Sequence, residues 1–195
     1  MRNLTYYVAT SIDGFIAAPD GSFSDFVFEG DHMAMIFAEY PDTLPAQGRE
    51  ARGIDAPNTN FDTILMGRNT YQVPGGLPSP YPHLRQYVFS TTLQDTPDDV
   101  EVVSSDPLDK VRELKQEDGL DIWLCGGGQL ASTLLPEIDK LVLKVNPVLL
   151  GRGIPLFDGE FPAERFTVGT PRVFTSGVVV MTYTRSAEQQ GEAVQ

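Results

Sequence analysis

Three consecutive glycines separate an apolar run from a helical pattern in "DIWLCGGGQLASTLL", residues 121–135. Glycine weakens strands and helices, so Gly126, Gly127 and Gly128 indicate a tight turn or a backbone that comes close to another molecule. A strand that turns through glycine into a helix suits a phosphate, because the first N–H groups of the helix are free and no Cβ blocks the approach. Gln129 follows, so the Lys-Ser/Thr pair of a P-loop is absent, and a simple tight turn explains the triplet equally well.

A second predicted strand end carries groups that bind anions. "FDTILMGRNTYQ", residues 61–72, passes through Gly67 into a helix start with Arg68 and Thr70. Arginine makes planar contacts to phosphate or stacks on adenine, and threonine at a helix start binds an anion or caps the helix. The alternative is a solvent-exposed arginine and an ordinary cap.

A third predicted strand end is polar. "VFSTT", residues 88–92, ends with the hydroxyls of Ser90, Thr91 and Thr92, although such a cluster is more often only a polar loop. In open α/β sheets, ligands bind outside the carboxyl ends of the strands. Three such ends in one sheet together predict a crevice for a phosphate-bearing ligand.

Composition restricts the class of protein. The 195 residues carry a formal net charge of −13, which argues against general binding to nucleic acids or anionic membranes. Cys125 is the single cysteine, so no internal disulfide forms and a cytoplasmic location is expected. With His32 and His83 far apart in the sequence, no metal site is expected. No apolar stretch approaches the ~20 residues of a membrane span.

Strand and helix patterns alternate along the chain. Strands are predicted at 3–12, 61–66, 85–92, 100–105, 120–125 and 139–150, helices at 31–40, 106–119 and 128–138, and a hairpin at 164–185. Residues 41–60 are predicted to form a long surface connection. This order predicts an α/β fold with a mostly parallel twisted sheet, flanking helices and an antiparallel C-terminal hairpin. One domain is expected over residues 1–186, with a polar tail at 187–195.

The same segments resemble a known family of reductases. "MGRNTYQ", "VFSTT" and "CGGGQLASTLLPEIDKLVL" resemble, in that order, three cofactor-binding segments of dihydrofolate reductases, and "VATSIDGFIA" resembles their first strand and loop. "VNPVLLGRGIPLF" and "FTSGVVVMTYTR" are more similar to the C-terminal reductase domain of riboflavin biosynthesis and its stand-alone relatives. The resemblance covers about residues 3 to 185, with all segments in the same order.

The resemblance implies a dihydrofolate reductase-like fold and a function. NADPH would lie across the strand ends and deliver hydride to a small heterocyclic or imine-type substrate, pteridine-like or riboflavin-precursor-like. In such reductases the pair equivalent to Gly126-Gly127 has a cis peptide and aims N–H groups at the pyrophosphate. The implied cofactor contacts are Ala9, Ile16, Gly67, Arg68, Thr70, Ser90, Thr91, Gly126, Gly127, Gly128 and Gln129. The alternative is a non-catalytic relative that binds a nucleotide or another small ligand.

The chain departs from the folate enzymes in its substrate half. Gln129 replaces a basic residue that often contacts the 2′-phosphate, so this position gives no reason to prefer NADPH over NADH. Phe26 replaces a loop tryptophan, and Lys144 replaces a threonine that supports the catalytic acid. Folate itself is therefore not the expected substrate. The segment "LLGRGIPLF", residues 149–157, resembles a loop that often packs against a second subunit, so a homodimer is expected.

The candidate catalytic residues are Asp31 and Lys144. An acid near the nicotinamide is useful because reduction of a C=N bond needs a proton as well as a hydride. In the folate reductases an acid lies five residues after the loop tryptophan, and the same spacing from Phe26 leads to Asp31. Asp31 is also a natural N-cap for the helix 31–40, which is the simpler explanation. We expect Asp31 and Lys144 to face one pocket beside Ile16, with Lys144 as the alternative proton donor.

Overall fold

The structure is a computed structural model that describes residues 1–73 and 75–186. Its helices are α1 (Asp31–Glu39), α2 (Ala46–Glu50), α3 (Arg68–Tyr71), α4 (Pro107–Gln116) and α5 (Gly128–Thr133). Its strands are β1 (Leu4–Thr10), β2 (Phe15–Ala17), β3 (Phe61–Gly67), β4 (Arg85–Phe89), β5 (Val100–Val103), β6 (Asp121–Gly126), β7 (Ile138–Val145), β8 (Ile154–Pro155), β9 (Phe166–Val168), β10 (Arg172–Val173) and β11 (Val179–Arg185). Short 3₁₀ turns cover Pro41–Thr43 and Leu135–Glu137.

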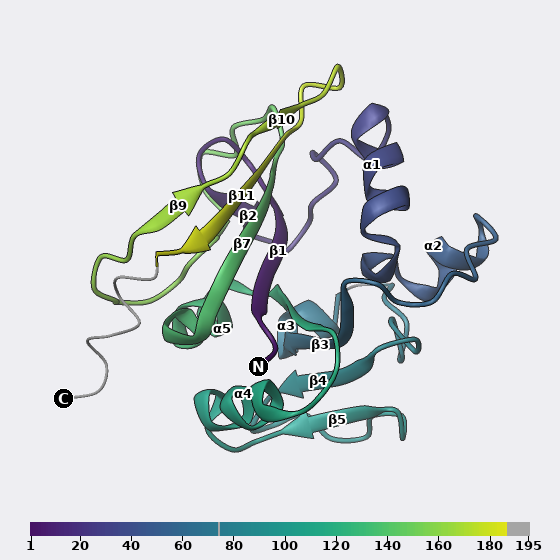
Figure 1. Ribbon diagram of the computed structural model, residues 1–195, viewed down its shortest axis with the longest axis vertical. Helices are drawn as coiled ribbons and strands as arrows, with labels where there is room; N and C mark the ends of the chain where they lie inside the picture. Colours follow the sequence, from purple (N-terminus) through teal and green to yellow (C-terminus); the bar gives the residue numbers. More distant parts are fainter. Residues whose placement is uncertain (74, 187–195) are drawn as a thin grey trace.

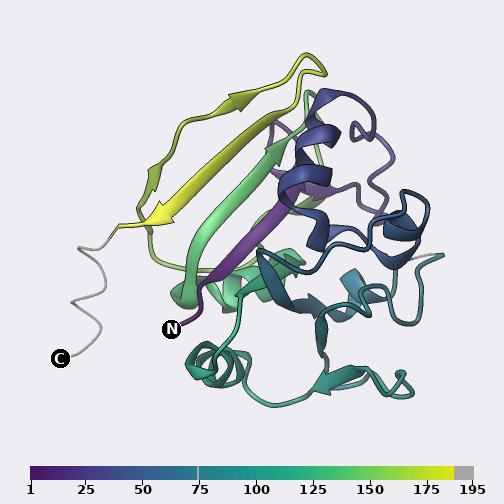
Figure 2. The same cartoon turned by 45° about the vertical axis from the view of Figure 1, so that its right-hand side comes forward.

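The main sheet has the strand order β10-β11-β7-β1-β6-β3-β4-β5, and β9 also pairs with β11. The six strands from β7 to β5 are parallel to their neighbours. β11 is antiparallel to β7, β9 and β10. Figure 2 shows the sheet twisting from the C-terminal strands through β1 toward β5. The predicted mostly parallel sheet with an antiparallel C-terminal hairpin is confirmed.

Successive residues of the strands point to two separate cores. Tyr6 belongs to the core under α4 and α5, whereas the next residue, Tyr7, belongs to the core under α1. The first core includes Leu65, Leu114, Leu124 and Leu130, and the second includes Met35, Ile36, Ile64 and Trp123. Figure 1 shows α1 beside β1 and β7, with α4 and α5 near the opposite end of the molecule. Because β1, β6, β3 and β4 run parallel, their carboxyl ends share one edge of the sheet. This edge lies between the two layers that pack on the sheet's faces.

Several predicted signals act locally as expected. The side chain of Asp106 caps α4, accepting hydrogen bonds from the N–H groups of Leu108 and Asp109. Gly177 has φ 85° at the turn between β10 and β11, a conformation that glycine adopts without a steric penalty.

Four local expectations differ from the structure. The loop after β1 contains β2, which pairs with β8, and the connection 41–60 contains α2. The strand predicted at 139–150 ends at Val145, and the helix predicted at 128–138 ends at Thr133. Short elements of two to five residues carry too little periodicity to be recognised in a sequence. The predicted tail, 187–195, lies outside the described residues.

Within the described part of the chain, no helix has the length and apolar character needed to cross a membrane. Across the same residues, 1–73 and 75–186, no group of three or more histidine, cysteine, aspartate or glutamate residues is arranged to hold a metal ion.

Candidate functional site

The glycine turn after β6 lies at the centre of the carboxyl edge. Gly126 has φ 135°, and its peptide bond to Gly127 is cis, as the resemblance implied. A Cβ on Gly127 would lie 3.5 Å from Thr70 Oγ1 and 3.9 Å from Ile16 Cδ1. A Cβ on Gly67 would lie 3.5 Å from the Gly127 nitrogen. The structure thus brings five of the predicted cofactor residues together around a small space that a side chain on Gly127 would occupy.

The start of α5 is available to an anion. Gly127 occupies the N-cap position, and no side chain caps the helix. The N–H groups of a first helical turn have no acceptor within the helix, so a ligand can use them. Gly128 fulfils a packing role as well, because a Cβ there would overlap the carbonyl oxygen of Pro155. The backbone N–H of Asp158 donates to the Gly128 oxygen at 3.1 Å, which holds the following loop against the turn.

Arg68 stands between the ends of β3 and β4. Its Nη1 donates to Thr92 Oγ1 at 2.8 Å and its Nε to Gln72 Oε1 at 2.9 Å, and the side chain is exposed. Ser90 Oγ accepts hydrogen bonds from the N–H groups of Thr92 and Leu93, so it shapes this turn. The guanidinium is bound only to neutral groups, which leaves its charge available to a phosphate.

The remaining predicted cofactor residues are spread around this edge. Ala9 lies in β1 and pairs with Lys144 of β7. Thr91 and Gln129 are exposed at the β4 and β6 ends respectively.

Lys144 projects from β7 onto the face of the sheet that α1 covers. Its Nζ lies 4.2 Å from the ring centroid of Tyr7, and the side chain is half-buried. Burial lowers the pKa of Lys144 to about 8. The neighbouring Cys125 thiol has a pKa raised to about 12, again chiefly by burial, so it is neutral at physiological pH. The carboxyl half of β7 therefore carries an amine with a transferable proton.

Asp31 is not the N-cap of α1, which corrects that expectation. Gly30 holds the cap position and makes no side-chain bond. The Asp31 carboxylate instead accepts hydrogen bonds from the backbone N–H of Thr175 at 2.8 Å and of Ser176 at 3.1 Å. Those bonds lower the pKa of Asp31 to about 2, the Thr175 bond contributing most. An exposed carboxylate held in its charged form in this way is a poor proton donor, and it contacts different residues from Lys144.

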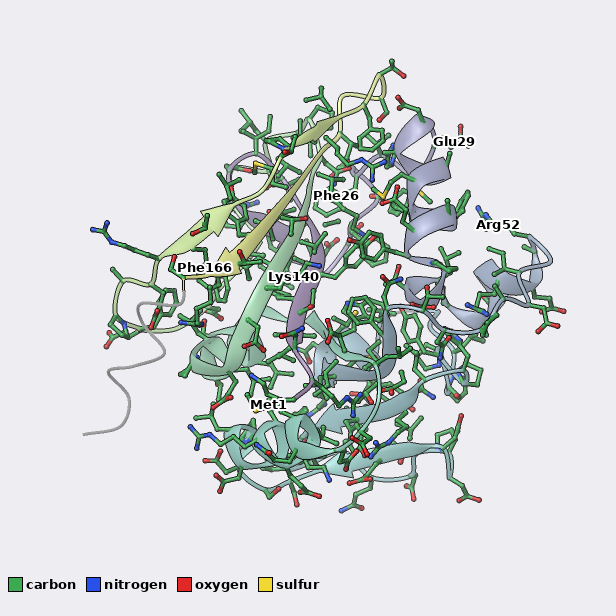
Figure 3. The ribbon with its side chains drawn as sticks, viewed as in Figure 1. Met1, Phe26, Glu29, Arg52, Lys140 and Phe166 are labelled. Atoms are coloured by element: carbon green, nitrogen blue, oxygen red, sulfur yellow. The ribbon has the colours of Figure 1, made fainter. Side chains whose placement is uncertain are left out.

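Phe26 and the loop before α1 lie beside the face of the sheet that α1 covers. Phe26 is buried, and Val27 N–H donates to Asn146 Oδ1 at 2.9 Å. In Figure 3, Phe26 and Glu29 lie toward the end where α1 begins, and Lys140 lies nearer the start of β7.

The segment expected at a subunit interface makes contacts within its own chain. Asp13 accepts hydrogen bonds from the N–H groups of Leu150 and Gly151, and Leu156 N–H donates to the Gly14 oxygen. Leu149 remains exposed. The homodimer stays a prediction.

Sequence analysis left Thr92 of the polar strand end without a role, and it missed Tyr7. Thr92, rather than Ser90 or Thr91, is the hydroxyl that Arg68 contacts. Tyr7 supplies the ring under Lys144. The alternation of β1 places Tyr7 and Ala9 on one face, and this signal could have identified Tyr7.

A separate hollow of about 340 Å³ opens at the opposite edge of the sheet. It is lined near the amino ends of β1, β3 and β6, by Thr5, Phe61 and Asp121 among others. None of the predicted cofactor or catalytic residues lines it, so it is not the predicted site.

Comparison with known proteins places this geometry in a family. The family model described as RibD C-terminal domain matches residues 2–180. The chain belongs to the RibD C-terminal domain family. Two proteins of Bacillus subtilis (strain 168) are similar: YwjB is 32% identical over 164 residues, covering 80% of this chain and 83% of its own. YyaP is 28% identical over 197 residues, covering 93% and 94%.

Solved structures of this RibD-like family and its neighbours have the same fold. A protein from Shewanella sp. PV-4 described as a "putative riboflavin biosynthesis protein" superposes with a TM-score of 0.67 at 25% identity, covering 95% of this chain and 99% of that one. A Thermotoga maritima deaminase/5-amino-6-(5-phosphoribosylamino)uracil reductase gives 0.61 at 17% identity, and the chain spans 57% of its length. Dihydrofolate reductase from Enterococcus faecalis, complexed with NADP(H), gives 0.61 at 16% identity, covering 94% and 96%. The predicted dihydrofolate reductase-like fold is confirmed.

Proposed function

We propose that this RibD-like protein is an NADPH-dependent reductase that transfers hydride to a small heterocyclic or imine-type substrate, pteridine-like or riboflavin-precursor-like. The observation that carries the proposal is the space at the carboxyl edge that Gly127 leaves open between Thr70 and Ile16. A Cβ would fill this space, so the backbone there is shaped for close approach by a ligand. Two similarly folded proteins, a uracil reductase and a dihydrofolate reductase, are reductases, which supports the same class of reaction.

The residues present are compatible with a dinucleotide. The uncapped start of α5, with Gly126 and Gly127 before it, would hold the pyrophosphate. Arg68, Ser90 and Thr91 would hold the phosphate of the adenosine half. NADPH supplies the hydride when it is bound.

Reduction of a C=N or C=O bond needs a proton as well as a hydride, and an acid in the site can supply it. Lys144 is the better candidate because its pKa of about 8 keeps a transferable proton near neutral pH. Asp31 would act instead through the turn between β10 and β11, which it holds by two hydrogen bonds. Its role is to position that turn against α1.

The second candidate function is binding of a nucleotide or another small ligand without turnover. The glycine turn and Arg68 would serve either function. What favours this alternative is that Asp31, the expected counterpart of the folate-type acid, is held charged at the β10–β11 turn.

The test is oxidation of NADPH by the purified protein with a panel of pterins, flavin precursors, quinones and imines. A reductase oxidises NADPH with at least one acceptor class, and Gly127→Val abolishes that activity while the protein remains folded by circular dichroism. Binding of NADPH without oxidation by any acceptor would support the non-catalytic alternative.

A further inference from the structure

Lys144 is a cation without an anionic partner among the residues that the structure describes. No aspartate or glutamate oxygen of the described residues lies within 4.0 Å of its Nζ. The ammonium rests instead on the Tyr7 ring at 4.2 Å. A half-buried ammonium without a counter-ion has lost part of its hydration, and a ligand anion would restore the balance.

The elements packed around Lys144 supply no substitute for that anion. β1 contributes Tyr7, whose hydroxyl is buried with a raised pKa, and β6 contributes Cys125, whose thiol stays neutral. The inward residues of α1 are His32, Met35 and Ile36, none of which is acidic. Both acids of α1 are bound elsewhere: Asp31 accepts from the backbone of the β10–β11 turn, and Glu39 pairs with Arg172 Nη1.

We propose that the reductase site accepts substrates that place a negatively charged oxygen against Lys144 Nζ, and that it rejects substrates with a cationic head. The inference rests on the proposed function and narrows its substrate class. A basic amidine head, which needs a carboxylate partner, would meet an ammonium here and be repelled.

The oxygen can carry its charge in two ways, and both use the same contact. In a carboxylate-bearing acceptor the charge is present from the start, and the ammonium anchors it. In a neutral carbonyl acceptor, hydride arrives at carbon and the C=O electron pair moves to oxygen. The Lys144 ammonium then donates a proton to that oxygen, and the resulting amine takes a proton from water. The first case predicts an effect on KM, and the second an effect on kcat.

Benzoate and benzamidinium test the proposal, because they share a planar ring and differ in the sign of their charge. Each is titrated calorimetrically into the full-length protein, with and without NADPH. Benzoate is expected to bind at least tenfold more tightly than benzamidinium. Lys144→Met should abolish that preference. Lys140→Met should retain it, because Lys140 lies four residues earlier on the same strand, at the opposite edge of the sheet.

The outcomes separate this inference from the proposed function. Equal binding of the two probes, no binding of benzoate, or a preference that survives in Lys144→Met overturns the inference even if NADPH binds. If the wild-type protein does not bind NADPH but prefers benzoate in a way that depends on Lys144, the proposed reductase function is wrong and the anion contact remains supported. With a reducible substrate, a cationic acceptor that the wild-type protein turns over faster than Lys144→Met does would also contradict the inference.

Discussion

Replacement of Gly127 by alanine should separate cofactor binding from folding. The new Cβ would lie 3.5 Å from Thr70 Oγ1 and 3.9 Å from Ile16 Cδ1, which are ordinary van der Waals distances. Gly127 has φ −91°, which alanine adopts without strain. The free energy of unfolding should therefore change by no more than about 1 kcal/mol. The methyl group nevertheless fills the space proposed for the pyrophosphate, so NADPH affinity should fall at least tenfold, or ~1.4 kcal/mol.

Two other glycine variants provide the comparison. Gly48→Ala, in α2, meets Pro45 at 3.6 Å and Arg52 Nη1 at 3.9 Å, both ordinary contacts, and should leave NADPH affinity unchanged. Gly128→Ala would overlap the Pro155 oxygen and should instead reduce stability. Titration calorimetry gives the affinities and urea denaturation the stabilities. A folded Gly127→Ala protein that binds NADPH as the wild type does would refute the assignment of this turn to the cofactor.

Three further predictions concern charged residues. Arg68→Ala should weaken NADPH by ~1.5–3 kcal/mol and NADH by less, if the guanidinium contacts the 2′-phosphate; equal losses in calorimetry would place it elsewhere on the cofactor. Lys144→Met should raise the free energy of unfolding at pH 7 by about 1–3 kcal/mol, because a folded-state pKa near 8 against 10.5 disfavours the ammonium in the folded protein. For the same reason, the free energy of unfolding of the wild-type protein should increase as pH rises from about 8 to 10.5, because Lys144 loses its charge. The same increase in urea titrations of Lys144→Met would contradict this. Asp31→Asn should lower the melting temperature but leave NADPH affinity unchanged. The stabilisation by Asp31 should disappear as pH falls from about 4 toward about 2, because the carboxylate becomes protonated. Equal melting temperatures of the variant and the wild type above pH 4 would show that the two hydrogen bonds contribute nothing.

The parts of the fold that sequence could predict are those with strong periodicity or unambiguous punctuation. The apolar strands β3, β6 and β7 and the capped helix α4 have such patterns, and their order specifies the parallel sheet. β2 and β8 have too few residues to show alternation. They pair because the first loop meets the loop after β7 in space, and local sequence carries no record of that contact.

The site shows the same division. The glycine turn and Thr70 were predictable because strand ends of a parallel sheet must meet at one edge. The role of Asp31 was not, because its side chain can satisfy either its own helix or a neighbouring backbone. The structure resolves this choice: the turn at Thr175 and Ser176 offers two N–H donors, while Gly30 takes the cap position.

The central claim is that the carboxyl edge of this sheet holds a dinucleotide, and direct titration of the unmodified protein with NADPH tests it. We expect one NADPH to bind per chain, with an affinity that decreases as salt is added, because charged contacts to phosphates carry much of the binding. A folded protein that binds neither NADPH nor NADH at low salt would contradict the account.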